Sequence, residues 1–162
     1  MEARGVSVEG GGPGAGGTQF ARWVFRIAGI YGLVVLLPQY LLEDRIGRDD
    51  PPAITHPEYF YGFVGVAVAW QFAFLVIATD PARYRPLMIP AVLEKAAFGL
   101  AVPILLAQGR ASGTLLAFGI IDLVLRVLFA AAYWRLRGVA GRAGNENGIP
   151  RNSHTSGTIA RK

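Results

Sequence analysis

The stretch YFYGFVGVAVAWQFAFLVIA, residues 59–78, contains twenty consecutive residues without a charged side chain. An α-helix rises about 1.5 Å per residue, so a run of this length crosses a hydrocarbon core of ~30 Å. In soluble proteins, helices that are apolar all round are usually shorter, and helices at the surface carry charged residues along one face. This segment therefore indicates a transmembrane helix, and it decides the class of the whole chain.

Three further apolar runs of similar length lie at residues 20–42, 87–107 and 114–134. The connections before and after the third run are only eight and six residues long, which favours antiparallel neighbouring helices. We therefore predict an all-α polytopic membrane protein with an antiparallel four-helix transmembrane bundle over residues 20–134. The composition agrees, because 17% of the residues are charged, whereas soluble domains carry about 25%.

Both ends of the chain lack the apolar residues that a packed segment requires. Residues 1–19 are rich in glycine, and residues 135–162 are polar and basic. Segments of this kind bury too little surface to offset the entropy lost on ordering. We therefore predict a disordered tail at each end.

The basic residues near the ends of the spans are distributed unequally between the two sides of the membrane. One side has Arg4, Arg22, Arg83, Arg85, Arg135, Arg137 and Arg142. The other side has Arg45, Arg48 and Arg110. Since arginine and lysine favour cytoplasmic loops, we predict a multi-pass protein of the cell inner (plasma) membrane with both termini in the cytoplasm.

Each span carries a strongly polar side chain at a similar depth, roughly 9–12 Å below the cytoplasmic face at the rise of an α-helix. These residues are Arg26, Gln71, Glu94 and Arg126, and Lys95 and Asp122 lie close to the same layer. Charges at this depth cost at least a few kcal/mol when they face lipid. We therefore predict that Glu94 pairs with Arg26 or Arg126 and Asp122 with Arg126.

Lys95 points about 100° away from Glu94 around the helix, so we expect its ammonium to extend toward the membrane surface. Two interpretations of the polar layer remain open. It is either a site for a ligand headgroup or a proton on Glu94, or a neutralised network that holds the helices in register.

Small residues recur at a spacing of four on two of the spans. Gly65, Ala69 and Ala73 follow one another on the second span, and Ala28 and Gly32 lie on the first. This spacing allows transmembrane helices to approach closely. We therefore predict that these residues form a packing face.

The connection between the first two spans contains several acidic residues and His56, at a spacing that matches no metal-binding motif. Thr55 and Glu58 are at capping-box spacing, and Pro57 suits the first helical turn. We therefore interpret this region as the start of the second span, and we expect no bound metal.

No catalytic or cofactor-binding motif is present. The chain has no cysteine, which excludes disulfides and zinc thiolate sites, and it has no nucleophile-elbow, zincin, phosphate-loop or haem-attachment motif. The net charge of +5 comes from basic residues at span ends and in the C-terminal tail, not from a patch with exposed aromatics. We therefore expect no cofactor, no nucleic-acid partner and no enzymatic activity.

Two stretches resemble family signatures, His56-Pro57-Glu58-Tyr59-Phe60-Tyr61-Gly62 and Val92-Leu93-Glu94-Lys95. With four short antiparallel spans and a compact polar layer, the chain resembles the DoxX-like group of small bacterial four-helix membrane proteins. The resemblance covers the size and layout of the four spans. It implies an accessory membrane role near redox enzymes, and it assigns no role to a residue.

The first hypothesis for the function is a non-enzymatic accessory subunit or a binder of a small amphiphile such as a lipid or quinone. The alternative is a small proton-coupled transporter acting as a dimer, with Glu94 as the titrating carboxylate. Pairing of Glu94 with an arginine would favour the first hypothesis. The expected partners are the lipid bilayer, a lipid or quinone-like ligand, and a second copy or a larger membrane complex.

Overall fold

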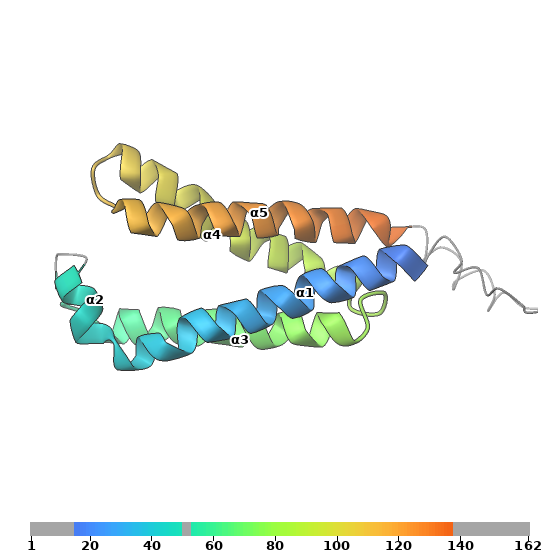
Figure 1. Cartoon of the computed structure of the whole chain (residues 1–162), viewed down its shortest axis with the longest axis horizontal. Helices are drawn as coiled ribbons and strands as arrows, with labels where there is room; N and C mark the ends of the chain where they lie inside the picture. Colours follow the sequence, from blue (N-terminus) through green and yellow to red (C-terminus); the bar gives the residue numbers. More distant parts are fainter. Residues whose placement is uncertain (1–14, 50–52, 138–162) are drawn as a thin grey trace, which may run out of the picture.

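The computed structural model describes residues 15–49 and 53–137, and every regular element in this part of the chain is a helix (Figure 1). The long helices are α1 (Ala15–Leu36), α3 (Pro57–Thr79), α4 (Met88–Ala107) and α5 (Gly113–Arg135). The short helices are η1 (Leu37–Leu41), α2 (Glu43–Asp49) and η2 (Arg85–Leu87). Four helices are long and apolar enough to span a membrane. The predicted class, an all-α four-helix membrane bundle, is confirmed.

The first helix begins earlier than we predicted. Residues 15–19 belong to α1, so the prediction that they are disordered is wrong. A Cβ atom at Gly17 would lie 3.2 Å from the carbonyl oxygen of Arg135, and the Arg135 guanidinium lies 4.3 Å from the ring centroid of Phe20. Contact with the end of α5 thus supports this first turn. The rest of the predicted tails, residues 1–14 and 138–162, lies outside the described residues.

The C-terminal end of the bundle also extends further than predicted. Arg135 is the last residue of α5, and Leu136 after it is fully buried. The prediction of a disordered tail from residue 135 is therefore wrong for its first residues. Burial of the Leu136 side chain stabilises this turn, since an apolar side chain removed from water gains about 1.5–3 kcal/mol.

Two short helices that we did not predict follow α1: η1 lies within the predicted first span, and α2 lies in the connection after it. Regular α-helix ends at Leu36, and Pro38 lies in the first turn of η1. A backbone N–H in the first turn has no acceptor within the helix, so the proline costs no hydrogen bond there. At the start of α3, His56 is the N-cap and Pro57 occupies the first turn as predicted. The predicted capping box is wrong, because the N-cap is His56 rather than Thr55 and its side chain makes no capping hydrogen bond. Glu58 instead contacts His56 Nδ1 at 3.2 Å.

The last two spans are joined by a compact turn with defined end signals. Gly109 has a φ of 68°, which permits the left-handed conformation that commonly ends a helix. The Ser112 side chain accepts a hydrogen bond from the Leu115 backbone N–H at 3.3 Å. Such a cap satisfies one of the free donors at a helix N-terminus. These signals fix where α4 ends and α5 begins.

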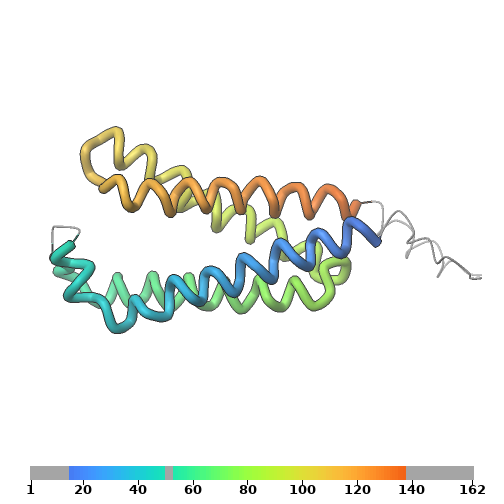
Figure 2. The backbone as a smooth tube through the Cα atoms, in the orientation of Figure 1, coloured from blue at the N-terminus to red at the C-terminus, as the bar shows by residue number. Residues whose placement is uncertain are grey.

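The four spans pack as two pairs. Helix α1 lies mainly against α3, and α4 lies mainly against α5, while contacts of α1 with α5 join the pairs. Figure 2 shows the pairs lying close together near the chain ends and diverging toward α2. We expected consecutive spans to be packed neighbours, but α3 and α4 make few contacts although only a short connection separates them.

Glycines form the seam within each pair. A Cβ atom on Gly29 of α1 would lie 2.8 Å from the Leu75 side chain and 3.0 Å from the Gln71 carbonyl oxygen, both on α3. A Cβ atom on Gly119 of α5 would lie 3.0 Å from Val102 of α4. Close approach at these glycines gives the pairs their van der Waals contact, the main source of helix association in lipid.

The predicted packing face of small residues is correct on one helix only. Ala28 and Gly32 are buried on α1, as expected. Ala69 on α3 is exposed, so the predicted stripe on that helix does not face its partner at this position. The buried positions of α3 include Gln71 and Phe74 instead.

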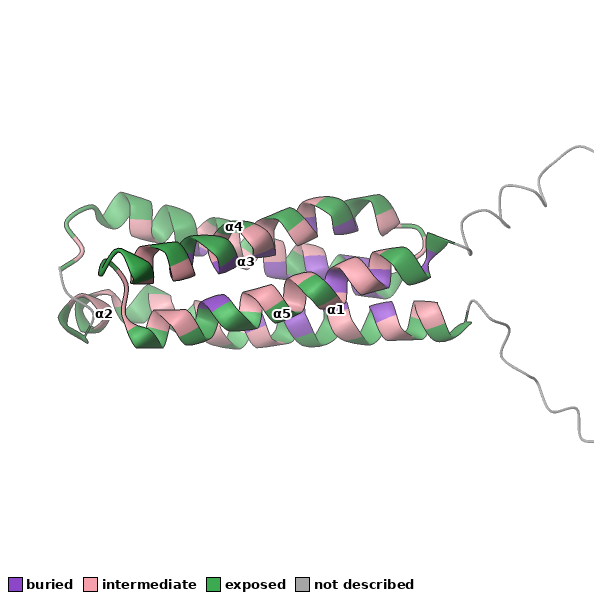
Figure 3. Cartoon of the chain, turned by 90° about the horizontal axis from the view of Figure 1, so that it is seen from above, coloured by how far each residue is buried: buried purple, intermediate pink, exposed green. Residues whose placement is uncertain are grey.

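The apolar core that joins all four helices lies at the end of the bundle that holds the described chain ends (Figure 3). Phe129 of α5 stacks on Phe25 of α1 with 4.1 Å between ring centroids, and it meets Phe74 of α3 edge-on at 4.9 Å. The other core residues are Ala21, Ala28, Ile77, Ala78, Met88, Ala91, Ala132 and Leu136. Nearer the opposite end, buried contacts such as Val102 with Gly119 form within one pair.

Candidate functional site

Lys95 lies on the buried face of α4. That face consists of Met88, Ala91, Lys95, Gly99 and Val102, which follow one another at intervals of three and four residues. Only 7% of Lys95 is exposed. The prediction that its ammonium extends toward the membrane surface is therefore wrong, because the helical period places this residue among the packing positions.

Two carboxylates hold the Lys95 ammonium. Its Nζ donates to Glu94 Oε1 at 3.3 Å and to Asp122 Oδ2 at 3.4 Å, and it lies 3.2 Å from Asp122 Oδ1. The predicted pairing of these carboxylates with arginines is therefore wrong. We refer to Glu94, Lys95 and Asp122 as the triad.

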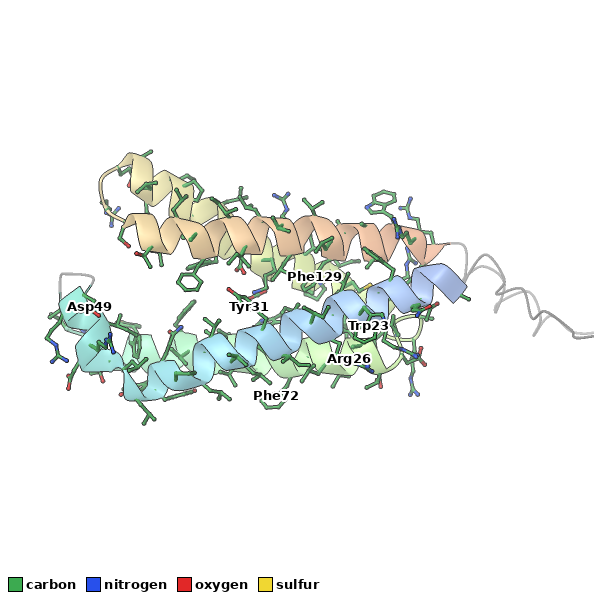
Figure 4. All side chains as sticks on the ribbon, in the orientation of Figure 1. Trp23, Arg26, Tyr31, Asp49, Phe72 and Phe129 are labelled. Carbon is green, nitrogen blue, oxygen red and sulfur yellow. The ribbon has the colours of Figure 1, made fainter. Side chains whose placement is uncertain are left out.

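All four spans approach the triad. The Lys95 ammonium lies 5.5 Å from the centroid of the Phe74 ring on α3, and Asp122 belongs to α5. From α1, Tyr31 lies between that helix and α5 (Figure 4). Glu94 is the tenth of the 23 residues in the candidate span Arg85–Ala107, so the triad lies near the middle of that span.

The triad has more negative than positive charge when its three groups are ionised. Two carboxylates share one ammonium, and the side chains of Glu94 and Asp122 are only 20% and 15% exposed. The Glu94 Oε2 atom lies 3.3 Å from Lys95 Nζ but outside hydrogen-bond geometry. Among the described residues this buried oxygen has no hydrogen-bond donor. The site can therefore accept a proton or a donor group from a ligand.

Three residues of the predicted layer do not join the triad. The Gln71 amide donates to the Ala67 carbonyl oxygen at 2.9 Å and packs against Gly32, in the seam between α1 and α3. Arg26 is exposed, and its guanidinium lies 5.6 Å from the Trp23 ring centroid. Arg126 is half-buried.

Within residues 15–49 and 53–137, neither Arg26 nor Arg126 forms an ion pair. Depth along a helix does not determine the direction of a side chain around it. Phe25 and Ala28 occupy the buried face of α1, and Arg26 projects about 100° away from Phe25. Equal depth therefore did not bring Arg26 to Glu94.

Sequence reasoning missed that the two carboxylates share one partner. We expected each of them to pair with an arginine, but Glu94 and Asp122 both contact Lys95. The signal was present in the chain, since Lys95 continues the spacing of Ala91, Gly99 and Val102 on α4. Reading that spacing as a packing face would have placed the lysine inside the bundle.

No protein-family model, curated protein or solved structure matches the chain, so no family is identified for it. The triad and the packing of the helices provide the basis for a functional proposal.

Proposed function

We propose that this protein is a non-enzymatic membrane protein that binds a small amphiphile, such as a lipid or a quinone, between its two helix pairs. The observation that carries the proposal is the position of the triad relative to the common core. Lys95 lies one turn beyond Ala91, and Tyr31 lies three residues beyond Ala28, which are the last core residues on their helices in that direction. Lys95 and Tyr31 thus lie just beyond the apolar core that joins all four helices.

The chemistry of this region suits an amphiphile. Ligand sites are mainly apolar with a few polar groups that fix orientation. Here, apolar helices surround an ammonium and two carboxylates, and Tyr31 projects from α1 toward α5 (Figure 4). The Lys95 ammonium can donate to a carbonyl oxygen, and Glu94 Oε2 can accept from a hydroxyl or an amine. A lipid or quinone offers groups of these kinds at one end and an apolar body at the other.

The arrangement of the triad favours a binding role over catalysis. Lys95 occupies the position between the two carboxylates, which a water molecule or a reacting bond would need in a carboxylate-dependent hydrolase. We therefore propose no catalytic residue. We propose an accessory role, in which the bound amphiphile or the bundle itself serves a larger membrane complex.

The test is purification in a mild non-ionic detergent, followed by solvent extraction and mass spectrometry. We expect one class of amphiphile at about one molecule per chain, and we expect the Asp122→Asn variant to retain less of it. Asp49→Asn is the matched control, since Asp49 is exposed and pairs with Arg45 outside the spans. Equal amounts of every lipid in wild type and Asp122→Asn would contradict the proposal.

A second candidate function is proton-coupled transport by a dimer of this chain. It is favoured by the surplus carboxylate of the triad, because Glu94 and Asp122 share a single ammonium, so that one of the two can take up a proton. Reconstituted in liposomes, a transporter would move protons in a manner that depends on Glu94. Absence of such flux, with an amphiphile bound, would leave the first function in place.

The orientation in the membrane is a separate prediction. The start of α1 and the end of α5 lie together, and arginines contact aromatic rings at this end, such as Arg85 with Tyr133 at 4.1 Å and Arg137 with Trp134 at 3.8 Å. We propose that this is the cytoplasmic end. Reporter fusions at Lys162 and after Gly47 should then report opposite compartments. A periplasmic C-terminus would contradict the proposed orientation.

A further inference from the structure

We propose that the triad selects amphiphiles whose polar end is a cation that donates hydrogen bonds, such as a protonated primary amine, with Glu94 Oε2 as the acceptor. This inference rests on the proposed function and names the ligand class of that site. It follows from the charge, the hydrogen bonding and the surroundings of the triad.

The charge of the triad favours a cation. Two carboxylates surround the single ammonium of Lys95, and no further ion pair with Glu94 or Asp122 exists within the described part of the chain. Within a membrane span an uncompensated negative charge is costly, and a bound cation or proton removes that cost. An anionic headgroup would add a like charge beside two carboxylates, which disfavours binding.

Hydrogen bonding favours a donor over a simple cation. Glu94 Oε2 is buried, and none of the described residues donates to it. A buried acceptor without a donor costs about 1–3 kcal/mol, and more when it is charged. A primary ammonium has three N–H donors, so it can satisfy this oxygen, whereas a quaternary ammonium cannot.

The two carboxylate side chains are the less buried members of the triad. Glu94 and Asp122 retain 20% and 15% exposure of their side chains, whereas the Lys95 side chain retains 8%. The apolar core closes the bundle on the side of the chain ends, and the pairs diverge on the other side (Figure 2). A ligand would therefore place its amine against the carboxylates, on the side of the triad that faces away from the core.

The experiment measures binding of four decyl probes to the full chain in a non-ionic detergent by native mass spectrometry. The probes are decylamine, decyltrimethylammonium, decanol and decanoate, which share one tail. We expect decylamine to bind at one molecule per chain, tightest of the four, with decanoate weakest. Glu94→Gln should weaken decylamine binding by about tenfold or more, as loss of a charged hydrogen bond does. Glu58→Gln, in an exposed carboxylate, is the control and should bind as wild type.

The outcomes distinguish a failure of the preference for cationic donors from a failure of the proposed amphiphile-binding function. Decanoate or decanol binding as tightly as decylamine would overturn the preference for a cationic donor and leave the amphiphile-binding function in place. Equal binding of decylamine and decyltrimethylammonium would overturn the role of the Glu94 Oε2 hydrogen bond. Failure of all four probes to bind would overturn both proposals. Glu94→Gln should stay folded, because Lys95 and Asp122 remain a neutral pair, and size-exclusion chromatography checks this.

Discussion

Lys95→Met should lower the stability of the bundle by about 3–5 kcal/mol, the cost of removing one partner from a buried ion pair. Methionine fills a similar volume but leaves Glu94 and Asp122 as adjacent carboxylates with no cation between them. The measurement is the folded fraction that remains after heating in detergent, followed by size-exclusion chromatography. We expect a large decrease in the midpoint temperature relative to wild type.

Three further variants test whether the loss of stability comes from the missing positive charge rather than from altered packing. Lys95→Arg keeps the cation and should lose much less stability. The triple variant Glu94→Gln, Lys95→Met, Asp122→Asn removes all three charges and should recover most of the loss, since neutral replacement of a whole buried network costs little. Arg110→Met, at an exposed cation, should behave as wild type. A Lys95→Met bundle as stable as wild type would show that the lysine does not neutralise the carboxylates.

Gly29→Leu should separate α1 from α3 and lower stability by about 1–3 kcal/mol, the usual cost of overpacking a tight interface. Even the first added atom would lie 3.0 Å from the Gln71 carbonyl oxygen, which belongs to the backbone of α3 and cannot rotate away. The helix axes must therefore move apart. Because the α1–α3 pair carries half of the bundle, we expect a lower midpoint temperature and faster proteolysis of the detergent-solubilised protein.

Gly62→Leu is the matched control for this substitution. Gly62 lies in α3, and no atom would be within 4 Å of a Cβ placed there. The same change of glycine to leucine should therefore leave stability equal to wild type or slightly higher, because leucine favours helix more than glycine does. If Gly29→Leu and Gly62→Leu lowered the stability of the bundle equally, the close approach of α1 and α3 at Gly29 would not stabilise that helix pair.

The sequence by itself determined the class of the protein. Uncharged runs such as residues 59–78 must form helices in lipid, because no water is available to satisfy the backbone groups. The count of four spans follows from local composition in the same way. The predicted start of the first helix was wrong at residues 15–19, because contact with Arg135, more than a hundred residues away, supports that turn.

Only the tertiary structure decided which polar groups meet. Depth could be counted along each span, but the partner of a charge depends on how each helix is rotated and which helix lies beside it. That rotation is set by the glycine seams at Gly29 and Gly119 and by the aromatic core around Phe129. These contacts place Lys95 between Glu94 and Asp122 and leave Arg26 outside, since packing in lipid depends on shape complementarity between whole helix faces rather than on any single residue.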